Sequence, residues 1–256
     1  MKNWRNHLGI LLPLLVVAGL TLWPTITDSV SNRETTFTIL KAIALATSLN
    51  ILLGYTGYVS FGHIVFYGFG GYVGLYFVND HGWSIWAGML VGGLSSGLLA
   101  FLLGKAILRL RGAYFALATI GINEAMRSFI NNFDLFGGPI GITLNFKVYR
   151  EYGGAADALE LAFYVMAGLT FAALILSHFV RTSKFGLGLL AIRENEDAAE
   201  VMGVRAPDAK TWAYVLSAII PGAVGVLFFF KNGHVEPHVV FPSWVLSPTR
   251  VCEASS

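Results

Sequence analysis

The sequence predicts an all-α membrane protein, a polytopic helical bundle of about seven spans in one domain over residues 1–256. Hydrophobic residues make up 55% of the chain and charged residues only 12%, and the mean hydropathy is +0.64. A soluble domain of this length needs a more polar surface than such a composition supplies. The apolar residues also gather in runs long enough to cross a bilayer. Lipid therefore replaces water around much of the chain.

A spanning helix needs about 20 mostly apolar residues. Seven segments approach this length, and all are predicted to be helical: 8–23, 37–53, 57–78, 85–108, 112–131, 159–180 and 212–230. The first has the basic and leucine-rich parts of a signal peptide, but "LWPT" at its end is not a small-residue cleavage site, so a retained span is favoured. Only "GYTG" joins the second and third segments, and the third is rich in glycine. It is either a continuous span or a broken, partly re-entrant one.

The placement of Lys and Arg predicts the orientation. If the amino terminus is cytoplasmic and the seven segments alternate, ten basic residues lie on the cytoplasmic side and five on the other, while Lys41 and Arg127 fall within spans. This distribution obeys the positive-inside rule, and the reversed topology inverts it. Residues 181–210 are then predicted to form a cytoplasmic segment.

Glycine recurs through "GYTGYVSFGHIVFYGFGGYVG", residues 54–74. One interpretation is close packing of helices, since small residues let helices approach each other. The other is a discontinuous segment whose free backbone groups line a polar cavity, with Ser60, Gly62 and His63 facing a permeation route. Tyr114, Thr119 and Glu124 of a later span are further candidates for that route. A lone intramembrane histidine is also consistent with simple packing, so His63 alone does not decide between the two.

Glu124 is the one acidic residue clearly inside a predicted span, and Arg127 follows it on the same helical face. A local ion pair is the favoured interpretation. The alternative is a carboxylate that couples transport to an ion gradient.

Residues 132–158 are long for a simple connection and begin near "FGGPIGI", which has the Gly and Pro pattern of an ordered turn. The segment either caps a pore or meets a partner, or it is an ordinary solvated loop. Further on, His234 and His238 in "HVEPH" have metal-ligand spacing on a helix, but Pro237 between them disfavours both the helix and a metal site. No metal, catalytic residue or cofactor is predicted.

The most specific feature is "AIRENEDAAEVMGV", residues 191–204, where five of the eight residues from Arg193 to Glu200 are charged. Asn195 can cap a short helix, and Glu196 and Asp197 then lie in the first turn, where the helix dipole favours negative charge. Gly203 is typical of a helix end. A helix of about seven residues is not stable alone in water, so it needs something to pack against. The alternative interpretation, a solvated loop, explains the charged residues but not the signals for a helix start at Asn195 and a helix end at Gly203.

Other features limit the possible functions. The single cysteine, Cys252, cannot form a disulfide within the chain, and the dispersed basic residues do not indicate a nucleic-acid-binding surface. No G-x-x-x-x-G-K-[ST] phosphate-binding loop is present in the 256 residues, so any ATP hydrolysis needs another polypeptide. A membrane enzyme is the weakest alternative, because no nucleophile, base and ligand set comes together in the sequence.

The segment "EDAAEVMG" resembles the EAA-x-x-x-G cytoplasmic motif of ABC importer permeases. Asp197, Ala198, Ala199 and Gly203 match it, although Asp197 replaces the usual Glu and the downstream I-x-L-P is missing. Together with residues 54–74, "RLRGAYFALATIGINEAMR" and "GGPIGI", it occurs in the order typical of the permease subunits of branched-chain amino-acid ABC transporters, the LivH/LivM type and nearer LivM. The resemblance covers about residues 37–247.

The resemblance implies a multi-pass subunit of the bacterial inner membrane that forms half of a translocation pore. Its implied partners are a second homologous permease, two cytoplasmic ATPases and a periplasmic substrate-binding protein. A helix over Glu196–Met202 would dock an ATPase, and the residues implied for this coupling are Arg193, Glu194, Asn195, Glu196, Asp197, Ala198, Ala199 and Gly203. The substrate would be a branched-chain or related amino acid, with urea or a short amide as an alternative.

The family continues after residue 247 with further spans, whereas this chain ends in "PTRVCEASS", so residues 248–256 are expected to be an atypical tail left by a truncation or frameshift. The competing mechanistic class is an ion-coupled secondary transporter with broken helices, which needs an unpaired intramembrane carboxylate and no ATPase-docking helix.

Overall fold

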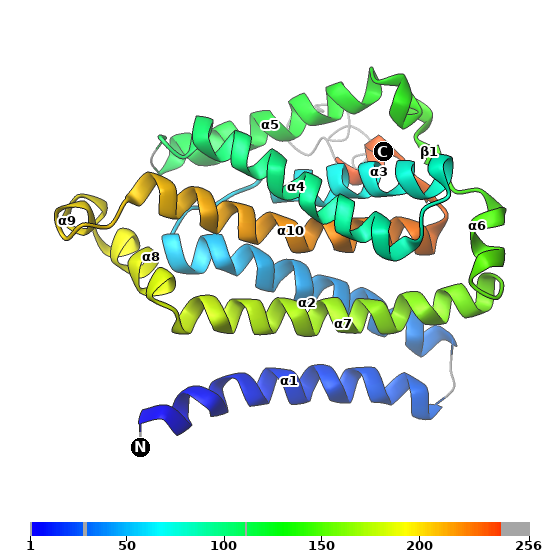
Figure 1. Ribbon diagram of the computed structural model, residues 1–256, viewed down its shortest axis with the longest axis horizontal. Helices are drawn as coiled ribbons and strands as arrows, with labels where there is room; N and C mark the ends of the chain where they lie inside the picture. The colour runs from blue at the N-terminus through cyan, green and yellow to red at the C-terminus, as the bar shows by residue number, and fades with distance from the viewer. Residues whose placement is uncertain (1, 28–29, 111, 242–256) are drawn as a thin grey trace, which may run out of the picture.

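The computed structural model describes all residues except 1, 28–29, 111 and 242–256. Within the described part the chain is a bundle of long helices (Figure 1). The long helices are α1 (Lys2–Thr27), α2 (Val30–Thr56), α3 (His63–His81), α4 (Ile85–Ile107), α5 (Ala113–Asn131), α7 (Ala155–Thr182) and α10 (Ala206–Asn232). The short elements are η1 (Asp134–Phe136), η2 (Gly138–Ile140), β1 (Ile142–Thr143), α6 (Phe146–Glu151), α8 (Lys184–Glu194), α9 (Glu196–Val201), β2 (His234–Val235) and α11 (Pro237–Val240).

Six of the seven expected apolar segments fall on a long helix over nearly their whole length, but the third, 57–78, is helical only from His63, where α3 begins. Among the described residues, four helical stretches are long and apolar enough to cross a membrane: Ser31–Thr56, Ile85–Ile107, Ala156–Thr182 and Ala206–Asn232. These observations confirm an all-α membrane protein. The expected tail, residues 248–256, lies outside the described residues.

α10 lies at the centre of the bundle, and 78% of its most apolar window is buried. It packs against α3 and α4 through glycines. A Cβ added to Gly70 of α3 would lie 2.5 Å from the Cα of Gly222 in α10 and 2.7 Å from the carbonyl oxygen of Gly92 in α4. Ser96 of α4 also donates a hydrogen bond to the Phe66 carbonyl at 2.8 Å. Close helix packing therefore accounts for part of the glycine pattern.

The rest of that pattern belongs to a break between α2 and α3. Residues 57–62 are not helical, and α3 begins only at His63. His63 lies beside Ser48, two turns before α2 ends, with 3.5 Å between Nε2 and the Ser48 Oγ. Figure 1 shows this segment running back from the end of α2 to the middle of the bundle, where α3 starts. We name residues 57–62 the re-entrant segment.

The two ends of the bundle differ (Figure 1). The N-terminus, α8 and α9 lie at one end, and α6 and β1 lie at the other. At this second end β1 pairs antiparallel with β2, with Ile142 opposite Val235, so residues 132–158 are tied to the end of α10. "FGGPIGI" forms an ordered turn, as predicted, in which Gly137, Gly138 and Gly141 all have positive φ.

Candidate functional site

α8 and α9 begin with side-chain caps. Ser183 accepts a hydrogen bond from the Gly186 N–H at 3.1 Å and starts α8. Asn195 is extended, and its side-chain oxygen accepts from the Ala198 N–H at 3.0 Å to start α9. Both caps satisfy donors that a helix start leaves free. The predicted capping role of Asn195 is confirmed.

The end of α9 is also set by local chemistry. The helix stops at Val201, and Gly203 has a φ of +89°, a conformation that L side chains rarely adopt. The Gly203 N–H donates to the Glu200 carbonyl at 2.9 Å, and the Val204 N–H donates to the Ala199 carbonyl at 3.0 Å. This is a helix end closed by a left-handed glycine. The predicted end at Gly203 is confirmed, with α9 one residue shorter than the expected 196–202.

α9 has one buried and one exposed side. Ala199 is 4% exposed and packs in an apolar cluster with residues that include Ile192 and Ala206. On the other side Val201 and Met202 are 88% and 84% exposed, and Asp197, Ala198 and Glu200 are exposed as well. The buried alanine supplies the packing that so short a helix needs. The exposed side chains of Val201 and Met202 therefore form an apolar tip at the end of α9.

A buried ion pair ties α9 to α10. The Lys210 ammonium lies 2.7 Å from Oε1 of Glu196, and the two side chains are 3% and 14% exposed. Lys210 also donates to the Tyr58 hydroxyl at 3.1 Å and to the Leu108 carbonyl at 3.2 Å. The Tyr58 hydroxyl in turn donates to Oε2 of Glu196 at 3.3 Å. This Lys210 cluster joins α9, α10, the end of α4 and the re-entrant segment through polar groups that would be costly to bury alone.

A second tether joins α8 to α2. The Arg193 guanidinium donates to the Gly54 carbonyl at 2.8 Å, in the last turn of α2, where the negative end of the helix dipole favours a cation. Glu194 beside it is exposed. Arg193 thus holds α8 against the last turn of α2, just before the re-entrant segment. The Lys210 cluster holds α9 against Tyr58, which lies within that segment.

A cavity of about 610 Å³ lies where these parts meet. Its walls come from the re-entrant segment, the first turn of α5 and the junction of α8 with α9. Any displacement of α9 therefore changes the shape of this cavity.

Four of the six candidates for a permeation route come together. The hydroxyl of Thr119 in α5 accepts from the Phe61 N–H at 3.1 Å, and a Cβ added to Gly62 would lie 2.8 Å from the Thr119 carbonyl oxygen. Ser60 and His63 flank this contact and are 6% and 9% exposed. Only glycine allows this close approach, so Gly62 and Thr119 fix the path of the re-entrant segment.

The other two candidates lie apart from this group. Tyr114 is 74% exposed near the start of α5. Glu124 forms the expected ion pair with Arg127 at 3.4 Å, and Arg127 also contacts Nδ1 of His238 at 3.0 Å. His234 has different partners, Thr143 and Glu236, so the two histidines do not face one ligand.

Sequence reasoning missed Lys210 and Tyr58 as members of the site. Lys210 counted only as a cytoplasmic basic residue, although its position among the apolar residues at the start of α10 was a signal of burial. Tyr58 lies 152 residues from Lys210, and nothing in the sequence links the two.

Several membrane-length helices packed around an irregular segment are a construction that many helical transport proteins share. Residues 33–249 match the family model described as branched-chain amino acid transport system / permease component. The chain therefore belongs to this family of permeases, and it is not itself an enzyme. Family membership does not favour an ion-coupled secondary transporter.

Two relatives share the family. The chain is 30% identical to the high-affinity branched-chain amino acid transport system permease protein LivM of Salmonella typhimurium and 29% identical to that of Escherichia coli. Each alignment covers 89% of this chain and 58% of the relative, so the chain spans little more than half the length of these proteins. No solved structure matches the chain.

Proposed function

We propose that the chain is a transmembrane subunit of an ATP-driven importer for branched-chain or related amino acids, and that α9 docks an ATPase. The observation that carries the proposal is the construction of α9 in a chain of this permease family. A capped helix, anchored by Ala199 and Glu196, presents Val201 and Met202 almost fully exposed at one end of the bundle.

The proposed mechanism transmits motion from α9 to the re-entrant segment. When two ATPase subunits close on ATP, the docked α9 moves as a lever. The contact between Arg193 and Gly54 carries this displacement to the end of α2, and the Lys210 cluster carries it to Tyr58 within the re-entrant segment. Access along the route past Ser60, Gly62 and Thr119 then alternates.

The partners and orientation belong to the same proposal. A second permease completes the pore, and a periplasmic protein delivers the substrate. The amino terminus and α9 are cytoplasmic in a seven-span inner-membrane arrangement. Support comes from the ten basic residues expected on this side against five on the other, and from the position of the N-terminus and α9 at the same end of the bundle (Figure 1).

The test compares two charged substitutions in exposed aliphatic side chains at opposite ends of the bundle. Val201→Asp changes the tip of α9, and Ile140→Asp changes a residue of η2 that is 78% exposed. Both variants are expected to insert in the membrane, because neither side chain packs inside the bundle. Only Val201→Asp is expected to abolish co-purification with the ATPase. Equal ATPase recovery with both variants contradicts the docking role.

A further inference from the structure

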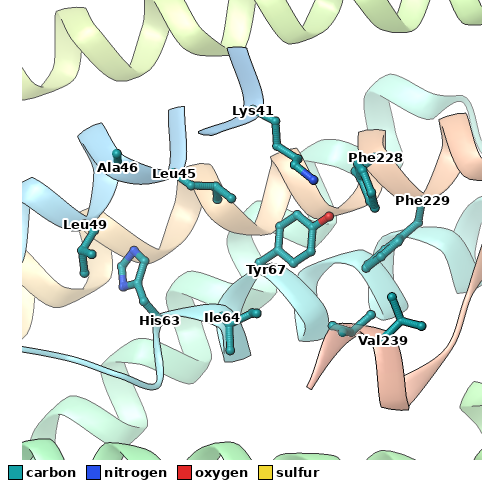
Figure 2. A pocket seen from close by; sticks show the side chains of 11 residues that line it. Lys41, Leu45, Ala46, Leu49, His63, Ile64, Tyr67, Phe228, Phe229 and Val239 are labelled. Carbon is teal, nitrogen blue, oxygen red and sulfur yellow. The ribbon is translucent and has the colours of Figure 1, made fainter. Parts of the chain in front are cut away.

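A second cavity, of about 420 Å³, lies between α2, α3, α10 and α11. Its lining is mostly aliphatic and aromatic, with Leu45, Leu49 and Ile64 on one side and Phe228 on the other. The polar groups in the wall are few. Figure 2 shows the Lys41 ammonium and the Tyr67 hydroxyl pointing toward one another, with His63 at the far side. We name this the Lys41 cavity.

Lys41 is a basic residue without a carboxylate partner among the residues that the structure describes. Within residues 2–27, 30–110 and 112–241, no carboxylate forms an ion pair with it. Its ammonium lies 3.7 Å from the centre of the Phe228 ring, and Lys231 repels it electrostatically. Lys231 itself pairs with Glu34. An intramembrane cation without a partner is costly and marks a functional site by default.

The position and direction of the Lys41 side chain limit the kinds of ligand that could neutralise its charge. The residue lies eleven positions after the start of α2 and fifteen before its end. At 1.5 Å per residue these distances are about 16 Å and 22 Å. Lysines near the end of an apolar span can reach lipid headgroups by extending toward the interface. The Lys41 side chain instead turns into the Lys41 cavity (Figure 2). A small anionic ligand inside the cavity fits this position.

We propose that Lys41 and Tyr67 bind the carboxylate of a transported amino acid whose aliphatic side chain occupies the apolar part of the Lys41 cavity. The ammonium and the phenol both donate to the carboxylate, in charge-assisted and neutral hydrogen bonds. An apolar pocket with a few convergent polar groups is the usual form of a small-molecule site. The inference rests on the proposed function. It adds the substrate group that is recognised and the residues that recognise it.

His63 connects this site to the transmission route. It lines the Lys41 cavity and is also the first residue of α3, directly after the re-entrant segment. Displacement of that segment moves one wall of the cavity. Substrate release is thereby linked to the motion of α9.

The test uses protection of a thiol introduced in the cavity wall. Cys252→Ser removes the one native cysteine, and Ile64→Cys places a thiol in the lining while Lys41 stays intact. The chain is held in lipid nanodiscs and treated with a sulfonate-bearing methanethiosulfonate, which reacts only from water. L-leucine, 4-methylpentanoate (which lacks the ammonium) and leucinamide (which lacks the carboxylate) compete with the reagent.

L-leucine and 4-methylpentanoate are expected to slow the labelling of the thiol at position 64, and leucinamide is not. Adding Lys41→Gln is expected to raise the protecting concentration about tenfold or more, while Lys41→Arg retains protection. Lys105→Gln is the matched control, because Lys105 also lies over a phenylalanine ring, at 4.3 Å from Phe101, but outside the Lys41 cavity.

Three results overturn the inference: no labelling of the thiol at position 64 from water, equal protection by leucinamide, or unchanged protection in Lys41→Gln. The assay contains no ATPase, so its failure leaves the docking role of α9 untouched. Co-purification of the ATPase with Lys41→Gln is measured in parallel. If that association persists while protection fails, the carboxylate site is wrong and the proposed importer subunit stands.

Discussion

Replacing Lys210 by methionine tests the anchoring of α9. Methionine keeps most of the length of the side chain but removes the ammonium that lies 2.7 Å from Glu196. The carboxylate of Glu196, 14% exposed, then stays largely buried without the ammonium, although the Tyr58 hydroxyl still donates to it. Removing one partner of a buried pair costs about 3–5 kcal/mol, and the residual exposure of Glu196 favours the lower end. We expect a loss of about 3 kcal/mol in the local stability of α9.

Hydrogen exchange of the α9 amides measures this loss directly, because they exchange when α9 opens locally. A change of about 3 kcal/mol raises the equilibrium constant for opening about a hundredfold. The exchange rate of the α9 amides is expected to rise by the same factor, until it reaches the rate of an unfolded chain. Lys184→Met serves as control, since Lys184 is exposed at the start of α8. Its effect on α9 exchange is expected to be small.

The double variant Lys210→Met with Glu196→Gln separates loss of the pair from loss of packing. Because it also removes the negative charge of Glu196, the double variant is expected to recover at least half of the stability lost in Lys210→Met. Unchanged α9 exchange in Lys210→Met, or strictly additive effects in the double variant, would refute the proposed anchoring.

Three further predictions follow from local geometry. Gly203→Ala forces a side chain into a φ of +89°, at a cost of about 1–3 kcal/mol, and is expected to speed exchange at the end of α9, whereas Gly188→Ala, with only an ordinary contact to meet, is not. Gly62→Val is expected to displace the re-entrant segment and abolish substrate uptake without preventing membrane insertion, whereas Gly121→Val, whose added Cβ meets nothing within 4 Å, retains uptake. Burial raises the pKa of Tyr149, which donates to the Phe230 carbonyl at 2.6 Å. Its stabilising effect is therefore present below pH ~10 and lost as pH rises through the raised pKa, so the Tm difference from Tyr149→Phe is expected to shrink in that alkaline range.

The parts of the fold that the sequence predicted depend on local chemistry. The start of α9 at Asn195 and its end at Gly203 follow from cap chemistry within a few residues of each other. The long helices follow from the apolar composition of their segments, although residues 57–62 of the third predicted segment are not helical. The cause of the glycine pattern in residues 54–74 was ambiguous. Glycine allows close helix packing, as at Gly70, and it also allows an irregular backbone, as at Gly62. Sequence alone does not separate these two uses.

The parts that could not be predicted depend on contacts between distant residues. The Lys210 cluster joins four elements, and its members gain their roles only when α4, α9 and α10 come together. The same holds for Lys41, whose lack of a carboxylate partner among the described residues is visible only once its surroundings are known. In both cases a lysine in the sequence indicated that burying its charge would cost free energy. Only the packed structure shows whether a carboxylate partner compensates for that cost.

The most direct test of the central claim is site-specific crosslinking of α9 to an ATPase. A photoreactive amino acid in place of Met202, which is 84% exposed, is activated in membranes that contain the co-expressed ATPase, and Val239, 72% exposed, is the control position in α11. The proposed docking predicts an ATPase adduct from position 202 and none from position 239. Absence of the adduct at 202, or equal adducts at both positions, would contradict the docking role of α9.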